Sequence, residues 1–169
     1  MRDFPHSLPF SQRRRAFTLV EISVVVTLLG LLVAMALPAY RHVTIRSKAA
    51  AVANDIRVFA TAFQTYSTQH GGWPPGGTPG VVPSEIADAI GSGFAKPTPI
   101  GGHYLWEYDS TSNGFHVTAA VTIVSTGDSP MTDDVDLLEM VDQTYDDGNT
   151  ATGNVQLGST NNLVFIIEP

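Results

Sequence analysis

The chain has 169 residues, no cysteine and a net charge of −7 at pH 7. This length suits one domain with a single core, and the lack of cysteine excludes disulfide bonds and thiol chemistry. Four of the nine basic residues and one of the sixteen acidic residues precede Phe17, so five basic and fifteen acidic residues follow, a net charge of −10. An acidic surface repels phosphates, so we expect no nucleic acid among the partners.

An apolar segment long enough to cross a membrane begins at Phe17. Residues 17–40 are 24 residues with a single charge, Glu21, and a helix needs about 20 apolar residues to span a bilayer. Three arginines at 13–15 come directly before it, and positive charge stays on the cytoplasmic side. We therefore predict a single-pass membrane protein with a cytoplasmic N-terminus. Glu21 is the exception, because a carboxylate costs about 3 kcal/mol at the bilayer centre and is usually paired or functional there.

The residues at the start of this segment form a recognisable processing motif. Residues 16–21 read Ala-Phe-Thr-Leu-Val-Glu, with basic residues before them and an apolar run after them. This pattern resembles the leader of type IV prepilins and of type II secretion pseudopilins. The resemblance implies that residues 1–16 are a basic leader peptide, that prepilin peptidase cuts between Ala16 and Phe17, and that the new amino group of Phe17 is N-methylated. The family usually has Gly before the cut, so we expect Ala16 to slow or alter processing.

The same resemblance implies roles for three residues of the helix. Glu21 pairs with the ammonium group of Phe17 in a neighbouring subunit, which neutralises both charges in the filament core. Gly30 and Pro38 are points where the helix loosens during assembly, in keeping with the intrinsic effect of both residues on helices. An ordinary kink is the alternative explanation for Gly30 and Pro38.

The function that the resemblance implies is that of a structural subunit, held in the inner membrane with a periplasmic head and then polymerised through its N-terminal helix into a type IV pilus-like filament in the periplasm or at the cell surface. Without cysteine, the disulfide-bounded loop of many adhesive pilins is excluded, so a type II secretion pseudopilin is the first expectation. A major or minor type IV pilin, serving adhesion, motility or competence, is the alternative. The implied partners are copies of the chain, other pilins or pseudopilins, prepilin peptidase and the inner-membrane assembly platform.

Two other classes of protein stay open. Residues 34–36, Ala-Met-Ala, also fit the cut of an ordinary secretory signal, which would release a soluble protein beginning near Leu37. Glu21 and the length of the apolar run argue against this signal. A membrane-anchored or secreted binding domain, with an acidic head for cations or cationic ligands, is the other class.

A long helix is predicted over residues 17–69, about 80 Å at 1.5 Å per residue. Its second half is amphipathic, with an apolar stripe on one face. The stripe consists of Ile45, Ala49, Val52, Ile56, Phe59, Phe63 and Tyr66. We expect it to pack on the chain's own sheet. The connection that follows, residues 70–102, holds nine Gly and six Pro, which excludes long regular elements. Trp73 is expected to pin this connection to the core.

Residues 103–169 show the period of two that predicts strands. One hairpin is expected around Asn113-Gly114, with Tyr104, Trp106 and Tyr108 on one face of its first strand. A second hairpin is expected from residues 155–157 and 163–167. A short helix carrying Val135, Leu138 and Val141 is predicted between them. The predicted fold class is α+β and pilin-like, with the long N-terminal helix packed on a four-stranded antiparallel sheet.

Catalytic motifs are absent from the sequence: there is no nucleophile elbow, zinc-protease signature, P-loop or dinucleotide fingerprint. We therefore expect a structural protein rather than an enzyme. The candidate metal ligands are Asp142, Asp146, Asp147 and Asn149, which place oxygen donors of the kind calcium prefers in a short segment. Calcium is the one cofactor that the sequence suggests, and a solvated turn is the alternative explanation.

Overall fold

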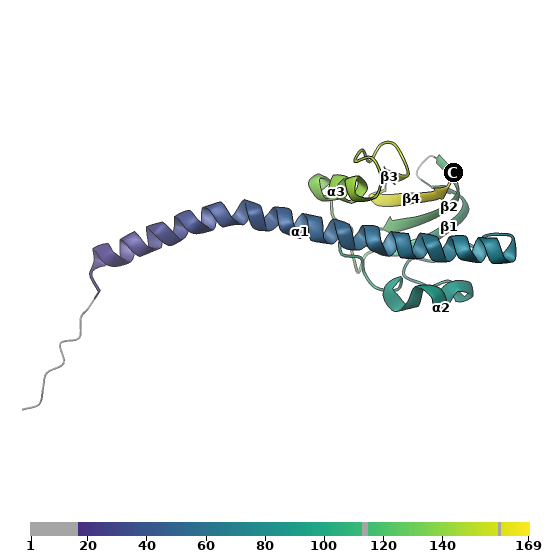
Figure 1. The fold of residues 1–169 in the computed structure, drawn as a ribbon, viewed down its shortest axis with the longest axis horizontal. Helices are drawn as coiled ribbons and strands as arrows, with labels where there is room; N and C mark the ends of the chain where they lie inside the picture. The colour runs from purple at the N-terminus through teal and green to yellow at the C-terminus, as the bar shows by residue number, and fades with distance from the viewer. Residues whose placement is uncertain (1–16, 113–114, 159) are drawn as a thin grey trace, which may run out of the picture. The chain divides into compact units, whose positions relative to one another are not determined.

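The structure is a computed structural model that describes residues 17–112, 115–158 and 160–169. The expected leader with Ala16, and the expected Asn113-Gly114 turn, lie outside the described residues. The chain divides at Tyr40 into two compact units, Met1–Tyr40 and Arg41–Pro169. Figure 1 shows the elements in chain order, and each unit is described by itself below.

The first element, α1 (Leu19–His70), is a helix of 52 residues that includes Pro38. It begins two residues later than the sequence pattern predicts, because Thr18 is the cap. The hydroxyl of Thr18 accepts a hydrogen bond of 3.1 Å from the backbone amide of Glu21, which satisfies one of the free amides of the first turn. The helix ends at His70, before Gly71, whose φ of 73° is left-handed.

Three short helical turns follow α1 in the Gly- and Pro-rich connection: η1 (Ser84–Ile86), α2 (Ala87–Ile90) and η2 (Gly91–Gly93). They bring Ile86, Ile90 and Phe94 into the core. Trp73 lies earlier in the connection. Its indole donates a hydrogen bond of 2.7 Å to Glu168, and its ring lies 5.6 Å from that of Trp106. Trp73 therefore ties the connection to the sheet.

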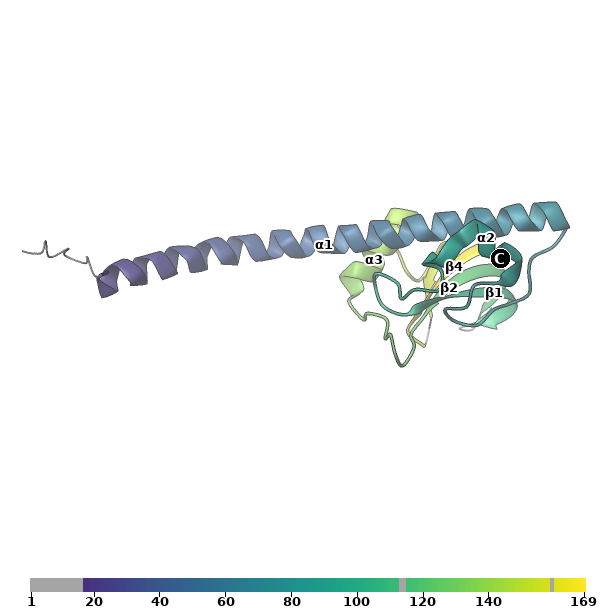
Figure 2. The same ribbon diagram turned by 90° about the horizontal axis from the view of Figure 1, so that it is seen from below.

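The sheet has four strands in the order β1-β2-β4-β3, and every neighbouring pair is antiparallel. The strands are β1 (His103–Ser112), β2 (Phe115–Val124), β3 (Val155–Leu157) and β4 (Asn162–Glu168). The helix α3 (Val135–Tyr145) lies between β2 and β3 in the chain. Figure 2 shows β1, β2 and β4 alongside the second half of α1. The predicted α+β fold, with a long N-terminal helix and a four-stranded antiparallel sheet, is confirmed.

The core lies between the amphipathic half of α1 and one face of the sheet. Six residues of the predicted stripe are buried in it: Ile45, Ala49, Val52, Ile56, Phe59 and Phe63. Aromatic rings dominate the contact, because Phe63 stacks on Trp106 with centroids 3.6 Å apart and Phe59 meets Tyr104 edge-on at 4.9 Å. Such rings bury more apolar area than any aliphatic side chain.

Two residues expected on packed faces are exposed instead. Tyr108 is 41% exposed, although Tyr104 and Trp106 on the same strand are buried. Val135 is 60% exposed, and Leu137, Leu138 and Val141 form the buried face of α3. Val135 is the first residue of α3, so its side chain lies at the end of the helix, before the first buried position.

Candidate functional site

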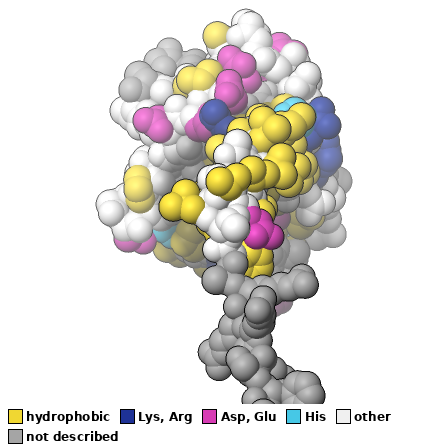
Figure 3. Space-filling view, turned by 90° about the vertical axis from the view of Figure 1, so that its left-hand side faces the viewer, with side chains coloured by type: hydrophobic (Ala, Val, Ile, Leu, Met, Phe, Trp, Pro, Cys, Tyr) yellow, Lys and Arg dark blue, Asp and Glu magenta, His cyan; other side chains and the backbone are white. Residues whose placement is uncertain are grey.

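The first compact unit presents an apolar surface around α1. Large hydrophobic residues from Phe17 to Leu37 are 48–86% exposed, for example Leu19 at 86% and Leu32 at 64%. In the described part of the chain, α1 is the helix long and apolar enough to cross a membrane, with a window of mean hydropathy 2.5 and no buried residue in it. Figure 3 shows hydrophobic side chains gathered on the face where α1 begins. Such a surface needs a lipid or protein environment.

Glu21 lies in the first turn of α1, three residues after the cap Thr18. The spacing Thr-x-x-Glu is that of a capping box, in which Ser or Thr at the cap is followed three residues later by Glu or Gln. This local role was not among the expectations above, although the motif is visible in residues 18–21. Glu21 therefore has a structural explanation beside the expected pairing with Phe17.

Gly30 and Pro38 both lie inside α1. A side chain at Gly30 would meet nothing within 4 Å, so no close packing requires glycine there. Pro38 has no amide hydrogen and so removes one helical hydrogen bond. The helix is continuous through both positions, and loosening at Gly30 and Pro38 stays a prediction from their intrinsic helix propensities.

The candidate calcium ligands lie at the C-terminal end of α3 and in the turn after it. Asp142 belongs to the last turn of α3, whereas Asp146, Asp147 and Asn149 follow in the turn. One carboxylate oxygen from each of the three aspartates lies within 4.8 Å of those of the other two. The structure therefore brings the three acids together.

Asp142 differs from the other acids because it is fully buried, with 0% of the residue exposed. Neither of its carboxylate oxygens has a partner with good hydrogen-bond geometry among the described residues, although the backbone amides of Gly148 and Asp147 lie close enough to favour its charged form. Burial first, and then the charge of Asp147, raises the pKa of Asp142 to about 6, against the opposing effect of the Gly148 amide. A buried carboxylate is costly, and these amides offset only part of that cost, because the pKa of Asp142 is still raised.

The other acids and Asn149 make hydrogen bonds within the turn. Asp147 accepts from the Asn149 amide at 2.8 Å and from the Thr152 hydroxyl at 3.0 Å. Asp146 accepts from the backbone amide of Asn154. The side-chain oxygen of Asn149 accepts from the Ala151 amide at 3.2 Å. Asn149 is thus engaged in the turn, and the cluster that fits a cation consists of the three aspartates.

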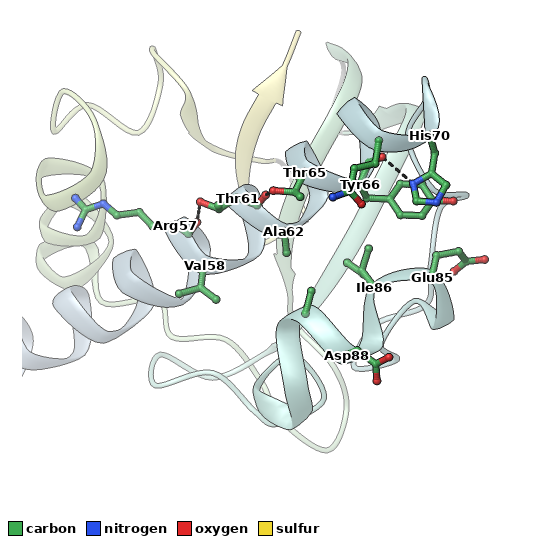
Figure 4. A pocket seen from close by; sticks show the side chains of 12 residues that line it. Arg57, Val58, Thr61, Ala62, Thr65, Tyr66, His70, Glu85, Ile86 and Asp88 are labelled. Atoms are coloured by element: carbon green, nitrogen blue, oxygen red, sulfur yellow. Dashed lines mark hydrogen bonds between the residues drawn. The ribbon is translucent and has the colours of Figure 1, made fainter.

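A groove of about 560 Å³ lies between α1 and the η1–α2 segment. Figure 4 shows Val58 and Arg57 toward one end and His70 at the other. The ring of His70 stacks on that of Tyr66 at 4.1 Å, and its Nδ1 lies 3.0 Å from the Tyr66 carbonyl oxygen. The histidine is therefore held by its own helix, and the groove offers an apolar surface with charged ends.

Comparison with known proteins gives consistent results at the level of sequence and fold. Residues 11–37 match the prokaryotic N-terminal methylation motif. The chain is 32% identical to the type IV major pilin protein PilE1 of Neisseria gonorrhoeae over 114 residues, which cover 68% of this chain and 60% of that protein. It is 28% identical to the fimbrial protein EcpC of Eikenella corrodens over 116 residues, which cover 69% of this chain and 67% of that protein.

Among solved structures, the fold is similar to that of the major type IV pilin PilA1 of Clostridium difficile, with a TM-score of 0.51, 15% sequence identity, and coverage of 74% of this chain and 97% of that chain. The matched regions span 43–60% of the length of three Neisseria pilins and fimbrial proteins. The long helix, the antiparallel sheet and the methylation motif define a pilin-like protein. The chain thus carries the prokaryotic N-terminal methylation motif and is similar to type IV pilins in sequence and in fold.

Proposed function

We propose that this chain is a structural subunit of a type IV pilus-like filament, anchored in the inner membrane and polymerised through α1. The observation that carries the proposal is the exposed apolar surface of residues 17–37, which has one charged side chain, Glu21. This surface needs lipid before assembly and the same helix of other subunits after it. A filament core of packed α1 helices meets both needs, and no catalytic step is required of the chain.

The Phe17 ammonium of a neighbouring subunit would be the partner of Glu21 in that core. A charge in an apolar surrounding is tolerated when an opposite charge neutralises it. Cutting after Ala16 by prepilin peptidase would create this ammonium group. The orientation follows from the arginines at 13–15, which favour a cytoplasmic N-terminus.

Of the two kinds of filament, the proposal favours a type IV pilus, because the relatives named above are type IV pilins and fimbrial proteins. A type II secretion pseudopilus is the second candidate. The lack of cysteine favours it, since the disulfide-bounded loop of many adhesive pilins cannot form. Deletion of the chain separates the two candidates: loss of surface filaments supports the pilus, and retention of exported enzymes in the periplasm supports the pseudopilus.

Three variants of Glu21 and a control test the assembly role. Glu21→Ala removes both the charge and the capping box. Glu21→Gln keeps the capping residue type but removes the charge, and Glu21→Asp keeps the charge on a shorter side chain. Glu139→Ala removes an exposed acid from α3 and serves as the control. Sheared filaments are quantified by immunoblot and electron microscopy, with membrane levels of each variant as the reference.

If Glu21 pairs with Phe17, filaments are lost in Glu21→Ala and in Glu21→Gln, and persist in Glu139→Ala. If Glu21→Gln assembles as the wild type does, Glu21 acts only as a cap and the pairing is wrong. Full assembly of Glu21→Ala would mean that Glu21 is needed neither as a charge nor as a capping residue, and its proposed role in assembly would be wrong.

Processing is tested by intact mass and N-terminal sequencing of the membrane-extracted chain, with and without prepilin peptidase. The expected product begins with N-methylated Phe17. Ala16→Gly should be processed at least as fast as the wild type. A product beginning near Leu37 would instead indicate an ordinary secretory signal, and the filament proposal would be wrong.

A further inference from the structure

Three of the five basic residues that follow Phe17 lie together directly after the apolar segment: Arg41, Arg46 and Lys48. We propose that Arg46 and Lys48 bind the phosphate groups of anionic phospholipids at the membrane surface where the apolar part of α1 ends. The inference rests on the membrane anchoring in the proposed function. It concerns the single subunit before assembly, so its test is separate from the assembly tests above.

Charge is separated along this part of the chain. No acidic residue lies between Glu21 and Asp55, although fifteen acidic residues follow Phe17 in total. Residues 41–48 are therefore a purely basic segment in an otherwise acidic chain. A basic segment next to a membrane helix attracts anionic lipids, by about fivefold in local concentration for each Lys or Arg.

The three basic residues of this segment differ in their partners. Arg41 is paired within the second compact unit, since its guanidinium lies 3.2 Å from the carboxylate of Asp134 and 3.3 Å from that of Asp136. None of the ion pairs among the described residues involves Arg46 or Lys48, and both residues are exposed. The positive charges of Arg46 and Lys48 are therefore available to a partner outside the subunit.

Tyr40 marks the end of the apolar segment. It is 73% exposed, and tyrosine is typical of the boundary between lipid and water, where its ring lies in lipid and its hydroxyl in water. The polar head-group layer on each side of a bilayer is about 5–8 Å thick. Residues that lie within this distance of Tyr40 can therefore contact lipid phosphates.

Helix geometry brings Arg46 and Lys48 into this layer. At 1.5 Å per residue, they lie about 9 Å and about 12 Å beyond Tyr40 along α1. Side chains of a helix lean toward its N-terminus and cover the preceding turn, about 5.4 Å long. Their charged groups are then about 4 Å and 7 Å beyond Tyr40, and Lys and Arg side chains extend toward such a surface readily.

Removal of the expected leader would make this segment more important. In the full chain, three arginines at 13–15 flank the other end of the apolar run. After a cut at Ala16, residues 41–48 would be the basic segment that flanks it. Lipid phosphates bound to Arg46 and Lys48 would then fix how deep the helix lies in the bilayer before another subunit binds.

The test uses the full-length chain in lipid nanodiscs with a probe beside the basic pair. The chain has no cysteine, so Ser47→Cys provides a single attachment site for a fluorophore, at an exposed position. Nanodiscs of phosphatidylcholine contain a small fraction of nitroxide-labelled lipid, either phosphatidylglycerol or phosphatidylcholine. The nitroxide is attached near the head group and quenches at short range, so the arginines at 13–15 do not affect the readout. The quantity measured is the quenching by phosphatidylglycerol divided by that by phosphatidylcholine.

This quenching ratio should be about threefold or more in the labelled parent chain. It should fall close to one in the double variant Arg46→Gln/Lys48→Gln, and in the parent at about 0.5 M salt, where exposed charges are screened. Lys48→Gln and Lys96→Gln form a matched pair, because each removes one exposed lysine. The first should lower the ratio and the second should leave it unchanged. Thermal unfolding followed by circular dichroism checks that each variant is folded.

Three results would overturn the proposal: a ratio of one in the parent, an unchanged ratio in the double variant, or equal decreases in Lys48→Gln and Lys96→Gln. If the parent has a ratio of one and the double variant loses sheared filaments, the basic pair contacts an acidic surface of another subunit instead. A chain that enters no nanodisc would contradict the proposed membrane anchoring together with this inference. Normal entry with a ratio of one would contradict the inference alone.

Discussion

The hydroxyl of Tyr104 donates a hydrogen bond of 3.0 Å to the carboxylate of Asp55, and this bond joins the second half of α1 to the start of β1. Tyr104 is almost fully buried, with 1% exposed. Burial first, and then the negative charge of Asp55, raises the pKa of Tyr104 above its ordinary range. The bond supplies a partner for a buried hydroxyl and orients α1 on the sheet within the second compact unit.

Removing either partner of this bond is expected to destabilise the protein by different amounts. Asp55→Ala leaves the buried Tyr104 hydroxyl without its acceptor and should cost about 1–3 kcal/mol. Tyr104→Phe removes the hydroxyl together with the hydrogen bond, so no buried donor is left without an acceptor and the loss should be about 1 kcal/mol. The double variant should cost little more than Asp55→Ala alone. Thermal unfolding of the full-length chain in detergent measures all three. Fully additive losses would show that the two groups do not interact.

Alkaline pH should destabilise the folded chain through the same tyrosine. Below the ordinary tyrosine pKa, about 10, Tyr104 is protonated in both states. Above it, the phenol ionises in the unfolded chain while the folded state keeps the proton, so stability falls as pH rises. The slope should reach about 1.4 kcal/mol per pH unit for one such group.

Tyr104→Phe should reduce this slope, which unfolding measurements between pH 8 and about 11 can detect. Part of the slope should remain, because burial also raises the pKa of Tyr145. An alkaline slope identical in the variant and the wild type would mean that Tyr104 ionises as easily in the folded state as in the unfolded one.

Stacking of Phe63 on Trp106 makes Phe63 a central residue of the core. Phe63→Ala should cost about 3–5 kcal/mol, through lost apolar transfer and the cavity left behind. Val58→Ala, on an exposed face of the same helix, should change stability by about 0.5 kcal/mol or less. If Phe63→Ala does not fold, Phe63→Leu provides a milder comparison. Equal losses at positions 58 and 63 would contradict the assigned packing of α1.

The sequence predicts the fold well because its two hydrophobic periodicities, one helical and one of strands, are strong and involve only residues close together in the chain. The apolar steps of four and three in residues 45–66 face the sheet as expected, and the alternation after His103 forms the strands. The Tyr104–Asp55 bond joins residues 49 positions apart, and no spacing rule links such a pair. The exposure of Tyr108 depends on how far the core extends along β1. The alternation of apolar and polar residues does not specify that extent.

The candidate sites were predictable in part. The acidic residues near the C-terminal end of the chain were visible as oxygen donors, but the burial of Asp142 was not anticipated. A signal for it existed, because Leu138 and Asp142 are four residues apart and so share one face of α3. An acid on an apolar helical stripe is as unusual as Glu21 within an apolar span. The capping role of Thr18 was also readable, from the Thr-x-x-Glu spacing.

Backbone geometry at Gly101 gives the last prediction. Its φ is 82°, and a Cβ there would overlap the carbonyl oxygen of Pro130. This glycine lies where the loop before β1 passes the segment before α3, and the Gly102 amide donates a 3.0 Å hydrogen bond to the Ser129 carbonyl oxygen. Gly101→Ala should therefore cost about 1–3 kcal/mol through strain and overpacking.

Gly93→Ala is the matched control, because a Cβ at Gly93 would meet nothing within 4 Å and its φ is not left-handed. Thermal unfolding should give a melting temperature that falls by several degrees in Gly101→Ala and stays within about 2 °C of the wild type in Gly93→Ala. A normal melting temperature in Gly101→Ala would mean that these two loops do not approach as closely as the structure places them.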